Sequence, residues 1–378
     1  MIEALGRYEL LRMLGRGGMA EVYLARRRVA GLEKRLVVKR IRRERAGDPA
    51  LLDLFMREAR VSMSLGHQNV VPVFDFGRVG DDAFLAMEYV DGRDLGSTLA
   101  RAARPMPPLL AAYVASECCR ALDHAHHRRT PEGGPAGVIH RDVTPRNVLL
   151  SWAGEVKLAD FGVATLAGDG DAQVRGTWAY MAPEQARGEP IDGRADLYAL
   201  GLVLWSMLAG TRPRPGDDPE ALRALATSGE LPALPAGPPA LVAVIARATA
   251  REREQRHADA HELQEALEAY LIGARAETPG PSPERQLAAW MAEVWGDEAR
   301  RGEPGVAVPL EVLTADRTQR SAAATVADED EAEGAGPAAV VPDVAAAARA
   351  PTAAPPAGAQ ARPRSRRLVA GAAAVAAG

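Results

Sequence analysis

HRDVTPRN, residues His140 to Asn147, places a carboxylate at Asp142 and an amide at Asn147 within eight residues. It combines charged and amide side chains with a proline, and it leads directly into the apolar residues 148–150. The polar residues are predicted to form a working loop of the protein, with Thr144 two residues after Asp142. Whether Asp142 and Asn147 perform chemistry in this loop depends on what the rest of the chain supplies.

The bulk composition is that of a soluble globular protein, with 378 residues, 47% of them hydrophobic and 25% charged. This length allows one large core or two ordinary ones and an appended tail. The formal net charge of −4 gives no general attraction to nucleic acid or anionic lipid, so no nucleic-acid partner is expected. The N-terminus lacks the apolar run of a secretory signal, which predicts a cytoplasmic location for the bulk of the protein.

Cysteine and lysine are both rare. Cys118 and Cys119 are adjacent, which suits two small, half-buried helix residues in a reducing compartment better than a disulfide. Lys34, Lys39 and Lys157 are the only lysines among the 46 basic residues. With arginine used almost everywhere else, each remaining lysine is a candidate for a specific role.

The chain divides into a strand-rich part and a helical part. Short segments rich in Val, Leu, Tyr and Phe, separated by Gly or Asp, predict strands at 8–18, 20–27, 35–42, 70–77 and 82–90. Between them, residues 49–65 carry apolar side chains at helical spacing, at Leu51, Leu54, Phe55 and Ala59. Residues 95 to 271 are predicted to be mainly helical. The apolar run from Leu197 to Gly210 is too short to span a bilayer and predicts a central core helix.

A different composition begins after Ile272. Residues 282–301 predict an amphipathic flanking helix, with Ser282 as N-cap and one apolar stripe formed by Leu287, Trp290, Met291, Val294 and Trp295. Two interpretations stay open: the stripe packs on the preceding domain, or Trp290 and Trp295 form a docking face for a partner.

The C-terminal residues predict no packed core. Residues 302–367 are rich in Ala and Pro, with an acidic cluster at 328–333, and are predicted to be a disordered linker. In 368–378 an uncharged apolar run follows a cluster of arginines. It is about half of the roughly 20 residues that a transmembrane helix needs. It is either the start of a truncated span, which would tether the protein to the inner membrane, or an Ala/Gly-rich tail.

A glycine-rich turn and a lysine point to phosphate binding. The sequence GRGGMAEV (15–22) joins two predicted strands, and glycines let backbone amides approach phosphate oxygens. Lys39 follows on the next strand within Val37-Val38-Lys39, and Glu58 lies on the predicted helix. The compact ammonium of Lys39 is not reproduced by arginine, so this position requires lysine.

Taken together, these motifs resemble the bacterial eukaryotic-like (Hanks-type) Ser/Thr protein kinases over about residues 8–271. The motifs are GRGGMAEV, VVK, REAR, HRDVTPRN, DFG (160–162), MAPE (181–184), DLYALG (196–201) and Arg256. The resemblance implies an α+β, two-lobed protein-kinase fold, with a small β-rich N-lobe at about 8–90 and a larger helical C-lobe at about 91–271. It also implies ATP in the cleft between the lobes and protein substrates.

The resemblance assigns roles in nucleotide binding. Residues that would cover the nucleotide or line its pocket are Gly15, Gly17, Gly18, Val22, Met87 and Leu149. The backbones of Glu88 and Val90 would pair with the adenine edge. Lys39 would hold the α- and β-phosphates, and Glu58 would orient it.

The resemblance also assigns the catalytic groups. Asp142 would accept the hydrogen bond of the substrate hydroxyl, and Asn147 and Asp160 would hold Mg²⁺, with Mn²⁺ as an alternative. Thr177 would touch Asp142 and favour Ser/Thr over Tyr substrates. Glu184 and Arg256 would form a structural ion pair, and His140 would be structural.

Two segments depart from the family pattern. Thr144 replaces a lysine that steadies the γ-phosphate, and the loss of such a donor costs about 2.7–4 kcal/mol, or roughly 10²–10³ in rate. Tyrosine kinases carry an arginine where Arg146 stands, so the hypothesis is that Arg146 supplies the charge. Between Thr165 and Thr177 there is no Ser, Thr or Tyr. Asp169 and Asp171 are predicted to replace an activating phosphate there.

Two classes of function follow. The first is an active Ser/Thr kinase in bacterial signalling, and the second is a nucleotide-binding pseudokinase that acts as a scaffold.

Overall fold

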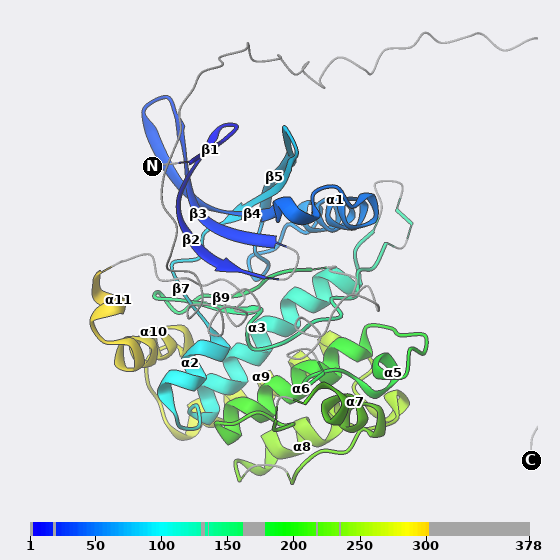
Figure 1. The fold of residues 1–378 in the computed structure, drawn as a ribbon. Coiled ribbons are helices and arrows are strands. Elements are labelled where there is room, and N and C mark those ends of the chain that lie inside the picture. The colour runs from blue at the N-terminus through cyan, green and yellow to red at the C-terminus, as the bar shows by residue number, and fades with distance from the viewer. Residues whose placement is uncertain are drawn as a thin grey trace, which may run out of the picture. The chain divides into compact units, whose positions relative to one another are not determined.

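The computed structural model describes residues 3–17, 20–129, 133–134, 136–161, 178–216, 218–233 and 236–301, except for the side chains of residues 58, 300 and 301. The predicted linker (302–367), the predicted span (368–378), Gly18, Thr177 and the segment with Asp169 and Asp171 lie outside the described residues. Figure 1 shows a sheet-rich lobe and a helical lobe, and the predicted two-lobed α+β architecture is confirmed.

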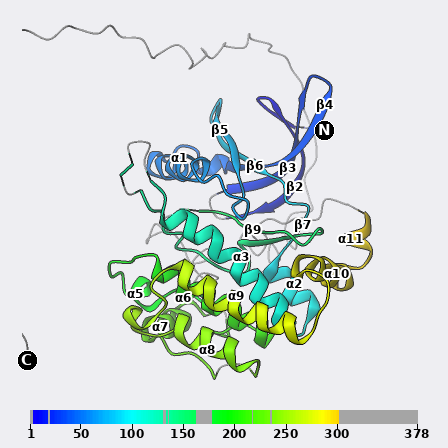
Figure 2. The same cartoon turned by 180° about the vertical axis from the view of Figure 1, so that it is seen from behind.

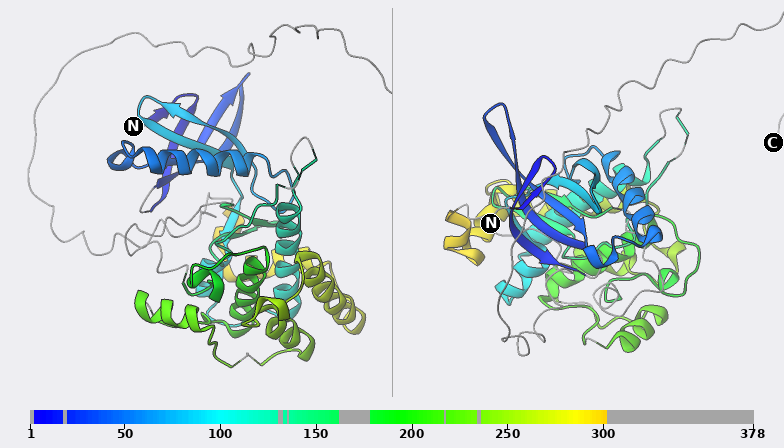
Figure 3. Two further views of the ribbon diagram at one scale, coloured as in Figure 1. Left: turned by 90° about the vertical axis from the view of Figure 1, so that its right-hand side faces the viewer. Right: turned by 45° about the horizontal axis from the view of Figure 1, so that its top comes forward.

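The small lobe is a six-stranded antiparallel sheet with one long helix against it (Figures 1 and 3). The strands are β1 (Glu3–Leu5), β2 (Tyr8–Arg16), β3 (Ala20–Val29), β4 (Leu32–Ile41), β5 (Val73–Val79) and β6 (Asp82–Glu88), in the order β1-β2-β3-β4-β6-β5. The helix is α1 (Pro49–Met63), preceded by a short 3-10 turn at Arg43–Arg45. Asp48 caps α1 by accepting from two backbone N–H groups, and proline at the first helical position suits the cap.

The predicted helical stripe explains how α1 docks. Leu51, Phe55 and Ala59 are buried in one apolar cluster with residues of the sheet such as Leu85. Leu54, which the spacing placed on the same stripe, is only half-buried. The helix is therefore fixed against the sheet by its apolar face, and its outer face remains polar.

The large lobe combines a small sheet with helices. The sheet is β7 (Gly92–Asp94), β8 (Val148–Ser151) and β9 (Val156–Leu158), all antiparallel. The helices are α2 (Leu95–Ala102), α3 (Pro108–His126), α5 (Pro183–Ala186), α6 (Arg194–Ala209), α7 (Pro219–Ser228), α8 (Pro239–Ala248) and α9 (Ala260–Glu277), with a 3-10 turn at Arg253–Gln255. Seen from behind in Figure 2, α3 and α9 lie side by side, and the two helices are in contact.

The core of this lobe is built around α6 and α3. Every side chain of α6 from Ala195 to Leu208 is buried, as expected for the apolar run. Cys118 and Cys119 are free thiols on α3. Both are fully buried, so the prediction of half-buried positions was wrong. Within the described residues, no helix is long and apolar enough to cross a membrane.

Two helices follow α9, namely α10 (Pro283–Trp295) and α11 (Asp297–Arg301). The Ser282 side chain caps α10 by accepting from the Arg285 N–H at 3.3 Å. The apolar stripe is buried in the core of the large lobe, where the Trp295 Nε1–H donates to Thr98 Oγ1 at 3.3 Å. Trp290 and Trp295 are only 5% and 9% exposed, so the packing interpretation holds and these rings offer no docking face.

A buried ion pair joins α5 to the residue after the 3-10 turn at Arg253–Gln255. The Arg256 guanidinium donates to both carboxylate oxygens of Glu184, at 2.6 and 2.8 Å. The predicted structural pair is confirmed. Both residues are almost fully buried, and the Arg256 guanidinium also donates to the backbone carbonyls of residues 194, 250 and 251, so the buried charge is fully hydrogen-bonded.

Candidate active site

One buried carboxylate fixes the start of the 140–147 loop. Asp196 on α6 accepts hydrogen bonds from the backbone N–H groups of His140 (2.7 Å) and Arg141 (2.8 Å). The Nε2 of His126 lies 2.8 Å from the same carboxylate. Arg141 has a φ of +70°, a conformation that costs energy for a non-glycine residue. The Asp196 carboxylate, through its hydrogen bonds to the two backbone N–H groups, holds the loop in that conformation.

Asp142 and Asn147 hold each other within the loop. The Asn147 side-chain amide donates to the Asp142 carboxylate at 2.9 Å and to the Asp142 backbone carbonyl at 2.7 Å. The Asn147 N–H donates to the Thr144 carbonyl at 3.0 Å and closes the turn. The aspartate that would receive the substrate hydroxyl is thus fixed before any ligand binds.

Asp160 is brought next to this pair by the backbone. The Ala159 N–H donates to the Asn147 carbonyl at 2.9 Å, and His140 Nε2 lies 2.9 Å from the Ala159 carbonyl. The His140 ring also packs on Phe161, with 4.5 Å between ring centroids. This contact supports the structural role predicted for His140. Asp160 itself has a φ of +59°, which turns the carboxylate away from the regular strand direction.

Lys39 reaches this site from the small lobe. It lies on β4, opposite Val22 on β3 and Leu85 on β6. Its ammonium lies 3.3 Å from the Asp160 carboxylate, and both side chains are mostly buried. Glu58 lies on α1, but its side chain is outside the described residues, so its orientation of Lys39 stays a prediction.

Four of the predicted nucleotide-pocket residues share one buried apolar cluster: Val22, Met87, Val90 and Leu149. Gly15 pairs with Val22 across β2 and β3, and the Gly17 N–H donates to the Ala20 carbonyl at 2.8 Å, which forms the glycine-rich turn. This places the turn over the same cluster.

The backbone of Glu88 was predicted to pair with the adenine edge, and the structure limits this prediction to its carbonyl group. Its backbone N–H donates to the Pro72 carbonyl at 3.0 Å, so this N–H is already used and is not the donor to an adenine edge. The Glu88 carboxylate pairs with Lys157 on β9 at 2.7 Å.

The third lysine, Lys34, lies 4.0 Å from the centroid of the Phe74 ring. Each of the three lysines therefore has a specific partner.

The candidate metal ligands fit a hard divalent cation. Asn147 offers an amide oxygen and Asp160 a carboxylate, which are the donors that such cations prefer. The described residues hold no group of three or more His, Cys, Asp or Glu side chains arranged for a metal ion. Two protein ligands alone suit a cation that takes its remaining ligands from phosphates and water.

Comparisons with known proteins agree with this geometry. The family description "Protein kinase domain" matches residues 8–263. The chain belongs to the protein kinase family. The kinase domain of Mycobacterium tuberculosis PknI, solved as a point variant, matches with a TM-score of 0.54 at 31% identity, covering 71% of this chain and 99% of that one. The prediction of a bacterial Hanks-type kinase is confirmed.

The similar proteins include a serine/threonine-protein kinase and a tyrosine-protein kinase. The kinase is 37% identical to the serine/threonine-protein kinase PknB of Mycobacterium tuberculosis over 288 residues, covering 72% of the chain and 44% of that relative. It is 35% identical to the tyrosine-protein kinase MasK of Myxococcus xanthus over 285 residues, covering 72% of the chain and 44% of that relative. The chain thus spans less than half the length of these relatives.

Two positions of the loop depart from the family pattern, Thr144 and Arg146. Thr144 and Arg146 line a pocket of about 350 Å³ between α2 and the end of α6. No described contact links Arg146 to Asp142, Lys39 or Asp160, so its role at the γ-phosphate stays a prediction. Thr177, the predicted contact of Asp142, lies outside the described residues.

Two residues that matter here were not singled out from the sequence. Asp196 is a lone acidic residue within the apolar run of α6, and such a residue signals that its charge needs buried partners. Asp94 is fully buried and caps α2 by accepting from the Ser97 N–H at 2.8 Å. Its signal is an aspartate directly before a helical pattern.

Proposed function

We propose that this chain is an active, ATP-dependent Ser/Thr protein kinase of bacterial signalling, which transfers the γ-phosphoryl group of Mg-ATP to protein hydroxyl groups. The observation that carries the proposal is the joint placement of Lys39, Asp142, Asn147 and Asp160, with Lys39 3.3 Å from Asp160 and Asn147 2.9 Å from Asp142. The similarity to PknB supports Ser/Thr as acceptors.

Each group has a defined task in this proposal. Asp142 receives the hydrogen bond of the acceptor hydroxyl and then its proton, and Asn147 keeps that carboxylate in place. Lys39 neutralises phosphate charge from the small lobe. Asn147 and Asp160 would hold the divalent cation, with Mg²⁺ the first choice and Mn²⁺ the alternative, and this cation would neutralise charge on the phosphates. The rate enhancement therefore comes from positioning and charge rather than from shifted pKa values.

The pseudokinase alternative finds no support in the described residues. A scaffold that only binds nucleotide has no need for an aspartate and an asparagine held together in the loop, yet this kinase keeps both and fixes them by hydrogen bonds. The tryptophan helix that would serve as its docking face is packed into the domain. The kinase domain is proposed to work in the cytoplasm, and tethering through 368–378 remains a separate proposal.

The test compares the full chain with Asp142→Asn in an assay with labelled ATP, Mg²⁺ and a general protein substrate. The wild type is expected to label the substrate, and the variant should lose about 10²–10⁴-fold in turnover while it keeps its affinity for ATP. Equal labelling by both proteins, or none by either, would contradict the proposal. Acid hydrolysis of the labelled substrate separates phosphoserine and phosphothreonine from phosphotyrosine, and phosphotyrosine alone would refute the Ser/Thr assignment.

A further inference from the structure

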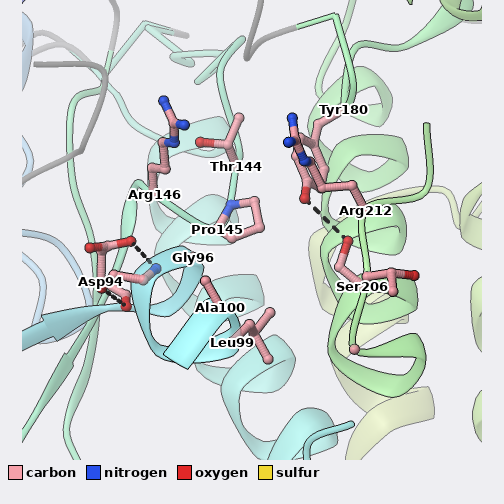
Figure 4. Close-up of a pocket in the computed structure, with 13 residues that line it drawn as sticks. Asp94, Gly96, Leu99, Ala100, Thr144, Pro145, Arg146, Tyr180, Ser206 and Arg212 are labelled. Carbon is pink, nitrogen blue, oxygen red and sulfur yellow. Dashed lines mark hydrogen bonds between the residues drawn. The ribbon is translucent and has the colours of Figure 1, made fainter. Parts of the chain in front are cut away.

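A pocket of about 350 Å³ lies beside the catalytic loop and is lined by residues 144–146 of that loop. Its walls come from four parts of the large lobe: the start of α2, residues 144–146 of the loop, Tyr180 before α5, and the end of α6 with the residues that follow it. Figure 4 shows Thr144 and Pro145 between α2 on one side and Tyr180 with Ser206 on the other. This volume is enough for a ligand group such as one long side chain.

Hydrogen bonds hold the pocket walls in place. The Gly96 N–H donates to the Pro145 carbonyl at 3.0 Å and joins α2 to the catalytic loop. A side chain at position 96 would lie 3.1 Å from the Asp94 carboxylate and 3.4 Å from the Arg146 stem, so glycine leaves the room that Arg146 occupies. On the opposite wall, Tyr180 and Ser206 share a hydrogen bond of 3.2 Å. The pocket is therefore built before any ligand enters.

The pocket contains polar groups that lack partners. Thr144 is 4% exposed, and its hydroxyl oxygen has no hydrogen-bond partner in the described part of the chain. The same holds for one carboxylate oxygen of the fully buried Asp94. Buried polar groups are nearly always satisfied, because an unpaired hydroxyl costs about 1–3 kcal/mol. Partners for these groups are expected from a ligand or from water.

Two arginines make the pocket cationic. The Arg146 guanidinium has no hydrogen-bond or ion-pair partner among the residues that the structure describes, and Arg212 lines the opposite side. In Figure 4 their guanidinium groups lie on either side of Thr144. Burial raises the pKa of Tyr180, and the positive charges of Arg212 and Arg146 oppose this rise, so both charges act at the same ring. An anionic group between them would be bound by charge-assisted hydrogen bonds.

We propose that this pocket is a substrate subsite that takes an anionic side chain near the acceptor hydroxyl, which rests on the proposed kinase function. Arg146 is only four residues after Asp142, so the two lie within about 14 Å of each other along the chain. A peptide with its hydroxyl at Asp142 reaches the pocket with a residue a few positions away. Arg146 and Arg212 bind the anion, and the Thr144 hydroxyl donates to it.

Asp94 is the group that opposes this assignment. Its carboxylate is fully buried, it is used as the cap of α2, and its pKa is raised by burial, with the charge of Arg146 acting against the rise. Because one oxygen of this carboxylate already accepts the Ser97 N–H, we expect Asp94 to attract a substrate cation only weakly. A preference for lysine in the substrate would mean that Asp94, and not the arginines, controls the pocket.

The test uses peptides with one acceptor serine and with glutamate, phosphoserine, alanine or lysine placed at each position from four before to four after it. At one of these positions glutamate should raise kcat/KM over alanine by about 10- to 100-fold, as expected for charge-assisted hydrogen bonds. The phosphoserine peptides show whether the pocket prefers a carboxylate or a phosphorylated residue.

Charge reversal supplies the decisive variants. In Arg212→Glu the order should invert, so that lysine is preferred over glutamate at the same position, whereas the control Arg285→Ala, which removes an exposed charge on α10, should keep the glutamate preference. Arg146→Ala should lower kcat/KM for the glutamate peptide through KM. A fall in kcat that is equal for all peptides would instead place Arg146 at the γ-phosphate.

Three results would overturn the subsite: no charge preference at any position, a lysine preference in the wild type, or a glutamate preference that survives both arginine variants. A chain that phosphorylates no peptide and does not label itself would instead contradict the kinase function. In that event, the same peptides can be labelled with a fluorophore and their binding to Asp142→Asn measured. Equal affinity for the glutamate and alanine peptides would refute the subsite.

Discussion

The two faces of the 140–147 loop differ in how their polar groups are satisfied. On the face toward the nucleotide cleft, Asp142 and Asn147 hold each other, and Asp196 fixes the backbone behind them. On the face toward α2 and α6, the Thr144 hydroxyl and one oxygen of Asp94 are buried without a partner in the described structure. The hydrogen-bonding groups of the first face are paired within the folded chain, whereas those of the second face need a bound ligand or water for their partners.

This difference separates positioning from recognition. Groups that carry out the same chemistry on every substrate gain from being fixed in advance, because preorganisation lowers the barrier. Groups that select a substrate must leave hydrogen-bonding capacity for it. Variants on the two faces should therefore have opposite effects on the free kinase: losses of stability or turnover on the first, and small gains of stability on the second.

The largest effect on the first face is expected from Asp196→Ala. The change leaves two backbone N–H groups of the loop and His126 without their acceptor, and it should lower the free energy of unfolding by about 3–5 kcal/mol. Urea unfolding of the purified domain measures this loss. Asp196→Asn keeps one acceptor oxygen and should lose less. Equal unfolding midpoints for the wild type and Asp196→Ala would show that the loop does not depend on this carboxylate.

Lys39→Arg should come next, with little change in stability. The planar guanidinium does not place its charge where the compact ammonium lies, 3.3 Å from Asp160. We expect kcat to fall by about 10²–10³, the usual loss for one donor at a developing charge. Steady-state kinetics with saturating ATP measure it, and Lys34→Arg, on the outer sheet, is the matched control. Full activity of Lys39→Arg would show that the ammonium is not required.

The smallest effect is expected from Thr144→Val on the second face. Valine keeps the shape of threonine and removes the buried hydroxyl that lacks a partner, so the free energy of unfolding of the free kinase should rise by about 1 kcal/mol. The same change should weaken binding of a glutamate peptide. Thermal unfolding checks the first outcome, and a drop in stability of similar size would mean that the hydroxyl is already bonded in the free protein.

Much of the fold and of the cleft could be predicted from the sequence, for reasons that individual residues illustrate. The spacing of Leu51, Phe55 and Ala59 predicted the face by which α1 packs, because side chains three and four residues apart share a helix surface. Trp290 and Trp295 were ambiguous, because an apolar stripe has the same pattern whether it meets its own domain or a partner. Thr98 and the core of the large lobe resolved this, and no local pattern connects them to residue 295.

The protein family and the residues of the cleft could be read from short motifs, because the chemistry of these motifs demands Lys39, Asp142, Asn147 and Asp160. The sequence presented Thr144 only as a missing lysine. The tertiary structure decided that Thr144 belongs to a pocket with Asp94, Arg146 and Arg212. The physical reason is that charge and hydrogen-bond satisfaction depend on which groups come within a few ångströms, and these groups come from segments far apart in the chain.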